Sequence, residues 1–199
     1  MAEPSRYNVS GDEEIGVLKN KLKIKDQKIL GDTETLLLSD AYSHFFEILN
    51  GNKLNFTVRL IFEINEYFLS VLYDWAGKIR EVEISKDGIL FCPKSQINKA
   101  LLKFEHILRE NMPLPKDNKR VVSQKLAIIH CEFNAIHPFR EGNGRTIRLF
   151  LDLIADNCGF QPINYGESTK ETYIKACIEG MKQDYSKMQR IMYKGLSVR

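Results

Sequence analysis

Apolar residues recur every three or four positions through most of the chain, and this spacing predicts a mainly helical protein. The polar stretch up to about Asp12 lacks the pattern, and we expect a frayed or loosely docked arm there. A lysine-rich turn is expected over residues 23–28, and the first clear helix runs from Thr33 to Asn50-Gly51-Asn52. Asn55 is a candidate N-cap for the next helix. The predicted buried face of that helix consists of Phe56, Leu60, Ile64, Phe68, Val71 and Leu72.

Helical spacing returns in the second half of the chain. The helix before His137 should end there, because Pro138 disfavours helical backbone at the residue that precedes it. The next helix starts near Arg145 and ends at Asn157-Cys158-Gly159. The other predicted helices span about 97–108, 119–136, 167–180 and 183–193.

One segment, residues 80–91, has the alternating pattern of strands instead. Its apolar positions are Val82, Ile84, Ile89 and Phe91. Asp87-Gly88 lies between the two halves and is a favoured turn of a β-hairpin. No internal repeat or low-complexity linker interrupts the chain. The predicted fold class is therefore all-α with one small β-hairpin, in a single domain.

The composition is that of an ordinary globular protein, since 43% of the 199 residues are hydrophobic and 28% are charged. The net charge of +3 results from 29 basic and 26 acidic residues that are mixed along the chain, which is too small a bias to indicate nucleic-acid binding. No apolar run reaches the roughly 18 residues of a membrane span, and the first residues lack the apolar core of a signal peptide. We therefore expect a cytoplasmic protein that binds neither nucleic acid nor membranes.

The four cysteines are far apart, and no C-x-x-C pair or histidine cluster indicates a zinc site. We expect them to be buried thiols in a reducing compartment. Of the four histidines, only His137 has chemically suggestive neighbours, and His44, His106 and His130 are interpreted as surface or core residues.

The segment from His137 to Arg148 reads HPFREGNGRTIR and has the parts of a polyphosphate site. One helix ends before the segment, a turn lies at Gly142-Asn143-Gly144, and another helix follows. This arrangement places backbone N–H groups and the positive end of the second helix at one point. The glycines allow a phosphate to approach the backbone and permit positive φ values. Arg145 and Arg148 are three positions apart, so both guanidinium groups can reach the same phosphates.

A base and a metal ligand complete the segment. His137, with a pKa expected near neutrality, can take a proton from an incoming hydroxyl. Glu141 offers a hard oxygen ligand for Mg²⁺ shared with phosphates. His137 and Glu141 could instead hold zinc on one helix face, but Pro138 and the glycines disfavour an unbroken helix there. The residues together favour nucleotidyl or phosphoryl transfer.

The segment also resembles the signature of the Fic (Fido) domain family, His-x-Phe-x-Asp/Glu-Gly-Asn-Gly-Arg-x-x-Arg, and matches every specified position. Residues 73–80, YDWAGKIR, are similar to the segment that leads into the flap hairpin of that family. Residues 17–22, VLKNKL, resemble an N-terminal stretch common in its bacterial members. The resemblance therefore covers nearly the whole chain.

The resemblance implies an enzyme that transfers AMP from ATP to a Tyr, Thr or Ser hydroxyl of a target protein and releases pyrophosphate. His137 would be the general base, Phe139 would anchor the loop in the core, and Glu141 would hold Mg²⁺. Gly142 would permit the turn. Asn143 and Gly144 would cradle the phosphates, and Arg145 and Arg148 would bind the outer ones.

In the family, the flap pins an extended target segment by adding a strand to its edge. The flap would span about residues 80–92 here, with Ile84, Ser85, Leu90 and Phe91 as candidates for target contact; core packing explains the three apolar residues almost as well. Residues 1–52 would form an N-terminal arm and helices that pack on the core. Residues 53–199 would form the Fic domain, with the active-site loop at 137–148.

Other functions stay open from the sequence. Phosphate transfer, as in the Doc toxins, is disfavoured because both glycines and Arg145 are kept, whereas phosphocholine transfer is not excluded. A nucleotide-binding interaction module without transfer activity is the alternative from another class. Many relatives carry an inhibitory Ser/Thr-x-x-x-Glu-Gly/Asn helix, and both near matches, Ser10–Glu14 and Ser43–Glu47, fail at the last position. We therefore expect a separate antitoxin-like inhibitor, a degenerate one, or none.

Overall fold

The computed structural model describes residues 8–9, 17–51, 53–86 and 89–199. The helices in these residues are α1 (Gln27–Asn50), α2 (Val58–Leu69), α3 (Ile97–Glu110), α4 (Lys119–Ile136), α5 (Asn143–Asn157), α6 (Lys170–Gly180) and α7 (Ser186–Gly195). Two short 3-10 helices, η1 (Lys94–Gln96) and η2 (Tyr165–Glu167), join them. The strands are β1 (Asn8–Val9), β2 (Ile84–Lys86) and β3 (Ile89–Leu90). The predicted fold class, all-α with a small hairpin, is confirmed.

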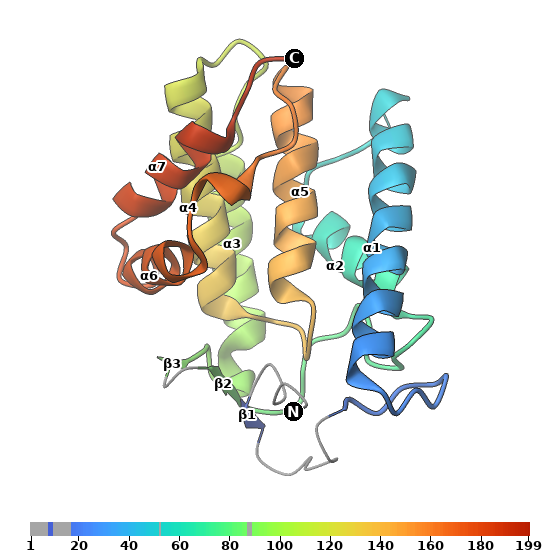
Figure 1. The fold of residues 1–199 in the computed structure, drawn as a ribbon. Helices are drawn as coiled ribbons and strands as arrows, with labels where there is room; N and C mark the ends of the chain where they lie inside the picture. Colours follow the sequence, from blue (N-terminus) through green and yellow to red (C-terminus); the bar gives the residue numbers. More distant parts are fainter. Residues whose placement is uncertain (1–7, 10–16, 52, 87–88) are drawn as a thin grey trace.

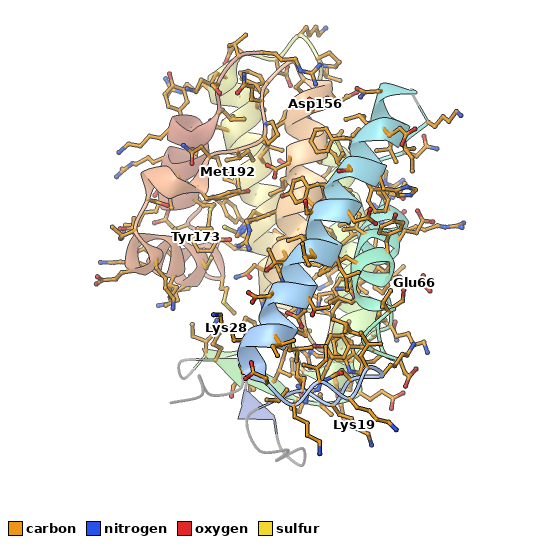
Figure 2. The ribbon with its side chains drawn as sticks, turned by 45° about the vertical axis from the view of Figure 1, so that its right-hand side comes forward. Lys19, Lys28, Glu66, Asp156, Tyr173 and Met192 are labelled. Atoms are coloured by element: carbon orange, nitrogen blue, oxygen red, sulfur yellow. The ribbon has the colours of Figure 1, made fainter. Side chains whose placement is uncertain are left out.

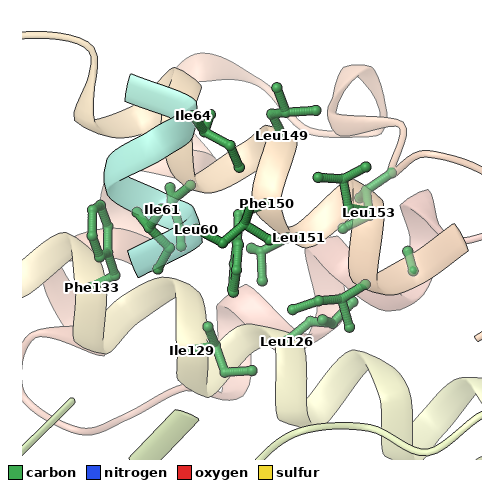
Figure 3. Close-up of a cluster of buried hydrophobic side chains, with 14 of the residues drawn as sticks. Leu60, Ile61, Ile64, Leu126, Ile129, Phe133, Leu149, Phe150, Leu151 and Leu153 are labelled. Carbon is green, nitrogen blue, oxygen red and sulfur yellow. The ribbon is translucent and has the colours of Figure 1, made fainter. Parts of the chain in front are cut away.

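Helix α5 is the centre of the bundle and lies between α4 and α1 (Figure 1). Phe150, near its middle, is fully buried among residues of α2 and α4 (Figure 3). The neighbours drawn from α2 are Leu60, Ile61 and Ile64, and those from α4 are Leu126, Ile129 and Phe133. One apolar core runs from α1 to the end of α7, so α1 is part of the same core as the later helices.

Side-chain caps explain where the helices begin. Asp26 accepts a hydrogen bond from the Ile29 N–H, so α1 begins at Gln27 and not at Thr33 as the periodicity indicated. The lysine-rich composition of residues 23–28 indicated a turn, so the sequence pattern did not predict a helix start at Gln27. Thr57 caps α2 through the Leu60 N–H, so the expected N-cap at Asn55 is wrong by two residues. Asn118 caps α4 in the same way.

The hairpin is shorter than predicted and belongs to a three-stranded antiparallel sheet of order β1-β2-β3. Ser85 pairs with Leu90 across the hairpin and with Asn8 on the other side. The expected turn at residues 87–88 and most of the predicted N-terminal arm lie outside the described residues. Asn8 and Val9, however, add a strand that the sequence pattern did not indicate. The sheet lies at the end of the bundle where α4 ends and α5 begins (Figure 1).

All four cysteines are free thiols, as expected. Cys131 and Cys158 are buried as expected, but the expected burial is wrong for Cys92 and Cys177, which are half-buried because they lie beside the flap and on the pocket face of α6. No described helix combines the length and the apolar composition that crossing a membrane requires.

Candidate active site

The loop between α4 and α5 places the backbone of His137 in an unusual conformation. His137 is the C-cap of α4 and has φ 48° and ψ 62°, in the left-handed region. Few residues other than glycine adopt this conformation, and it is most often kept at functional positions. Pro138 explains why the helix stops here, as predicted, because it disfavours helical backbone at the residue before it.

The imidazole of His137 is held on two sides. Its Nδ1 lies 2.5 Å from the Asn134 carbonyl oxygen, so Nδ1 carries the proton and Nε2 carries the lone pair. Phe91 of the flap stacks on the ring, with 3.8 Å between the ring centroids. The side chain is buried, and this burial lowers the pKa of His137 to about 3. The expected pKa near neutrality is therefore wrong, because the sequence pattern carries no sign of this burial.

Gly142 is required by the turn that leads into α5. It is the N-cap of α5 with φ 82°, and a Cβ atom there would lie 2.8 Å from Cδ1 of Leu69. Gly144 lies inside the first turn of α5 with no positive φ, and a Cβ there would meet only Nη1 of Arg148 at 3.6 Å. The sequence argument from positive φ therefore holds for Gly142, and close approach of a ligand is the remaining reason for Gly144.

The side chain of Asn143 stabilises the loop itself. Its Oδ1 accepts a hydrogen bond from the Phe139 N–H, and its Nδ2 donates one to the Phe139 carbonyl. Asn143 is buried and does not line the pocket, so only its backbone N–H remains as the predicted phosphate contact. Phe139 is fully buried and packs edge-on against Phe62, at 4.8 Å between ring centroids, as expected of an anchor.

The two arginines of the segment have different surroundings. Arg145 forms an ion pair with Glu34 of α1 at 2.6 Å and a longer one with Glu141 at 3.5 Å. For Arg148 no ion pair with a carboxylate is found among the described residues, and its guanidinium lies over the ring of Tyr165, 5.9 Å from the centroid. Glu141 also accepts a hydrogen bond from the Gly142 N–H. Arg148 is therefore the arginine that is available to an anionic ligand.

Two residues that the sequence did not single out fix the loop from outside. Arg80 is buried, and its guanidinium donates hydrogen bonds to the carbonyl oxygens of His137, Val82 and Cys92. Asn65 of α2 donates to the Glu141 carbonyl and accepts a hydrogen bond from the Gly77 N–H. Arg80 is the last residue of YDWAGKIR, the segment similar to the lead into the family's flap, and this similarity is the sequence signal that includes it.

The four candidates for target contact lie in different environments. Ile84 and Phe91 are buried and pack under the sheet with Val82 and Met181. Ser85 is half-buried, and Leu90 is 64% exposed. Strand β1 pairs with β2 at Asn8–Ser85 and Val9–Ile84 and occupies the strand edge that the hairpin alone would leave open.

These elements enclose a pocket of about 220 Å³. The loop and α5 form a polar wall with His137, Glu141, Gly142, Gly144, Arg145 and Arg148. Helix α6 and its C-cap residue form the opposite, mostly apolar wall, which consists of Tyr173, Ile174, Cys177, Ile178 and the C-cap Met181. Lys86, Ile89 and Phe91 of the flap line the third side. A ligand with an anionic part and a flat apolar part fits a pocket of this kind.

The described residues contain no group of three or more His, Cys, Asp or Glu side chains that could hold a metal ion by themselves. Glu141 is the one carboxylate among the pocket-lining residues. A single carboxylate that shares the ion with phosphate oxygens is a common arrangement for Mg²⁺. The donor set therefore suits Mg²⁺ that arrives with a polyphosphate.

Comparison with known proteins gives consistent results. A family model described as Fic/DOC family matches residues 55–155. Protein adenylyltransferase VbhT of Bartonella schoenbuchensis is 31% identical over 190 residues, which cover 94% of this chain and 38% of that protein. A protein of Escherichia coli K12 named "Probable protein adenylyltransferase Fic" is 28% identical over 185 residues, which cover 92% of this chain and 89% of that protein.

Solved structures show the same fold. BepC of Bartonella tribocorum with bound AMPPNP aligns with a TM-score of 0.76 and 21% identity, over 94% of this chain and 96% of that one. The N-terminal Fic domain of a Bartonella quintana protein with bound ADP aligns with a TM-score of 0.75 and 22% identity, over 94% of both chains.

Proposed function

Since this chain belongs to the Fic/DOC family, we propose that it is a protein adenylyltransferase, which transfers AMP from ATP to a hydroxyl group of a target protein and releases pyrophosphate. The observation that supports this most is that one pocket combines the imidazole of His137, an anion-binding helix start and Arg148. The wall opposite these groups is the apolar face of α6. The relatives named adenylyltransferases support the same activity.

ATP would lie with its phosphates on the first turn of α5 and its base against α6. The N–H groups of residues 143–145 begin a helix and point toward its N-terminal end, where the helix dipole favours anions. Arg148 would bind the outer phosphates, and Arg145, held by Glu34, would bind those nearer the loop. The apolar side chains of Ile174 and Ile178 suit the flat adenine ring.

Glu141 would hold Mg²⁺, which when bound would supply positive charge against the phosphates of ATP. In the described structure Oε1 of Glu141 lies 3.5 Å from the Arg145 guanidinium and accepts a hydrogen bond from the Gly142 N–H at 2.8 Å, so the carboxylate is held at the start of α5, where the phosphates would lie.

His137 would act as the general base. With Nδ1–H bonded to the Asn134 carbonyl, Nε2 takes the proton of the target hydroxyl as the hydroxyl oxygen attacks the α-phosphorus. The bond from the α-phosphorus to the bridging oxygen breaks, and pyrophosphate leaves with that electron pair. The lowered pKa of His137 keeps the imidazole in its neutral, proton-accepting form at physiological pH.

The target segment would add to the sheet at β2. A strand that pairs with β2 on that side must take the place of β1, because Asn8 and Val9 pair with this edge. Backbone pairing reads little of the target sequence, and the exposed Leu90 offers one side-chain contact. A separate inhibitor that places a carboxylate on Arg148 would close the same pocket.

Incubation with Mg²⁺ and ATP labelled at the α-phosphate, in the presence of lysate proteins, tests the proposal. The wild-type protein should transfer label to protein, and His137→Ala should lower the rate by roughly 10²- to 10⁴-fold. If His137→Ala transfers label at the wild-type rate, His137 is not the general base. Binding of ATP without any label transfer would favour the interaction module.

A further inference from the structure

Arg145, in the first turn of α5, lies between two carboxylates, and the two contacts differ in length. Its Nη1 lies 2.6 Å from Oε2 of Glu34, whereas its Nη2 lies 3.5 Å from Oε1 of Glu141. A short hydrogen bond between charged groups is strong, and a contact at 3.5 Å is weak. Glu34 therefore holds the guanidinium more firmly than Glu141 does.

Glu34 comes from a distant part of the sequence and contacts Arg145 from outside the pocket. It lies on α1, which packs beside α5. The first turn of α1, with Lys28, lies at the end of the bundle that carries the sheet (Figure 2). Glu34 is 4% exposed and does not line the pocket, whereas Arg145 and Glu141 do. The contact with Glu34 therefore leaves the ligand side of the pocket wall unobstructed.

The Glu34 carboxylate is itself held in place by Tyr73. The Tyr73 hydroxyl donates a hydrogen bond to Oε1 of Glu34 at 2.6 Å, so the two carboxylate oxygens bind different partners, Tyr73 and Arg145. Burial of Tyr73 and its bond to this carboxylate raise the pKa of the hydroxyl, which therefore keeps its proton and remains the donor. The Tyr73 ring stacks on Trp75, with 4.3 Å between the centroids. Glu34 is thus fixed in orientation where it meets Arg145.

Glu141 is the second carboxylate within reach of Arg145. Its Oε1 is already held by the Gly142 N–H at 2.8 Å, on the side where Nη2 of Arg145 approaches. Without the bond to Glu34, the guanidinium would close the gap of 3.5 Å and form a direct ion pair with Glu141. An arginine in that position competes with a cation for the same carboxylate.

We infer that Glu34 is a positioning residue that holds the Arg145 guanidinium and thereby keeps the Glu141 carboxylate available to Mg²⁺. The inference rests on the proposed function, because that function assigns Mg²⁺ to Glu141. Glu34 acts only through Arg145, since it does not line the pocket. Its loss should therefore change the response to the metal more than it changes the binding of a nucleotide without metal.

The test is calorimetric titration of folded variants with ADP, once with Mg²⁺ and once with EDTA. ADP has phosphates that can share the ion, but it cannot release pyrophosphate and is not consumed. The measured quantity is the factor by which Mg²⁺ strengthens ADP binding. Glu141→Gln removes the ligand and should bring this factor close to one. Glu34→Gln should lower it about ten-fold toward that limit, the size expected for one hydrogen bond between charged groups that must break before the ion binds.

Asp117→Asn is the matched control. Asp117 pairs with Lys125 at 2.8 Å, and both side chains are largely buried. This pair lies near the start of α4, whereas His137 and the pocket lie at its other end. The variant therefore makes the same acid-to-amide change in an ion pair away from the pocket. It should leave the Mg²⁺ factor at the wild-type value.

Arg145→Gln supplies a second readout, which also serves if Glu34→Gln does not fold by itself. Glutamine at position 145 has no charge with which to form an ion pair with Glu141. In this background the Mg²⁺ factor should therefore be the same with and without Glu34→Gln. The double variant places two neutral amides together, so no buried charge is left without its partner.

The inference is overturned if Glu34→Gln leaves the Mg²⁺ factor at the wild-type value. A purely structural role would lower both affinities together, and a brake in which Glu34 blocks Arg145 would raise both together. An effect of Glu34→Gln that persists in the Arg145→Gln background would overturn it too. If Mg²⁺ does not strengthen ADP binding to the wild-type protein, the assignment of Glu141 in the proposed function fails, and this inference fails with it.

Discussion

The Arg80 side chain donates a hydrogen bond from Nε to the carbonyl oxygen of His137, at 2.8 Å. The Arg80 N–H also donates to the carbonyl of Pro138, so the start of the flap is tied by two bonds to the loop that carries the imidazole. Phe91, at the other end of the flap, stacks on the His137 ring. The base and the surface proposed for target binding are therefore parts of one connected unit.

Replacing Arg80 should damage both stability and transfer. Arg80→Met leaves buried carbonyl oxygens without their donor, and we expect the free energy of unfolding to fall by about 3 kcal/mol. AMP transfer should fall at temperatures where the variant is folded, because the His137 backbone loses its restraint. Urea unfolding and single-turnover labelling measure the two effects. Lys78→Met, at an exposed cation of the same segment, is the control and should match wild type in both.

Alanine substitutions at Gly142 and Gly159 distinguish the cost of a steric clash from the cost of backbone strain. Both have positive φ, 82° and 85°, but a Cβ at Gly142 would meet Leu69 at 2.8 Å, whereas nothing lies within 4 Å of one at Gly159. Gly159→Ala should lower the free energy of unfolding by about 1 kcal/mol, the strain alone. Gly142→Ala should lower it by about 2 to 4 kcal/mol, because overpacking adds to the strain. Equal losses of unfolding free energy in chemical denaturation would show that the Leu69 side chain moves aside without cost and that the predicted clash is absent.

The buried histidines predict a pH dependence of stability. The pKa of His137 is lowered to about 3 by burial, against about 6.5 in an unfolded chain, so the unfolded state binds more protons between these values. Stability should therefore fall as pH drops below about 6.5. Between pH 7 and pH 5 His137 should contribute roughly 2 kcal/mol of this loss. His137→Gln should show a loss smaller by that amount in urea unfolding, and identical losses would mean that the imidazole is protonated in the folded protein.

Strand β1 predicts that the N-terminal segment competes with the target. Asn8 and Val9 pair with Ser85 and Ile84 on the strand to which the target would add. Removing residues 1–9 should speed label transfer to targets several-fold and leave ATP affinity unchanged. The double variant Asn8→Pro, Val9→Pro, which removes two backbone donors in the full chain, should act in the same direction. If both variants modify targets at the wild-type rate, β1 does not lie in the path of the target.

Local patterns predicted the elements that depend on local chemistry. Pro138 indicated the end of α4, and the alternation of Ile84, Ile89 and Phe91 indicated the hairpin. The start of α1 was missed, because a single cap residue, Asp26, outweighed a lysine-rich stretch. The motif likewise led to His137, Glu141, Arg145 and Arg148 of the pocket lining, but not to the α6 side chains that form the other wall. The Asn143 side chain, also part of the motif, does not line the pocket.

The supporting contacts could not be predicted in this way. Glu34 and Arg145 are 111 positions apart, and Arg80 and His137 are 57 apart, so only the packing of α1 and the flap brings them together. The pKa of His137 depends on the same packing, since Phe91 and the loop bury the ring. A sequence pattern identifies the residue types, but it does not show how deeply each side chain is buried. This burial sets the pKa of the side chain and therefore its charge.

The measurement that tests the central claim most directly compares two labels of ATP. Wild-type protein, Mg²⁺ and target proteins are incubated with ATP labelled either at the α-phosphate or at the γ-phosphate, and the labelled residue is identified by mass spectrometry. The proposed activity predicts label on a protein hydroxyl from the α-position alone, with pyrophosphate released and with the signal lost in His137→Ala. Transfer of the γ-label to protein would show phosphate transfer and contradict it.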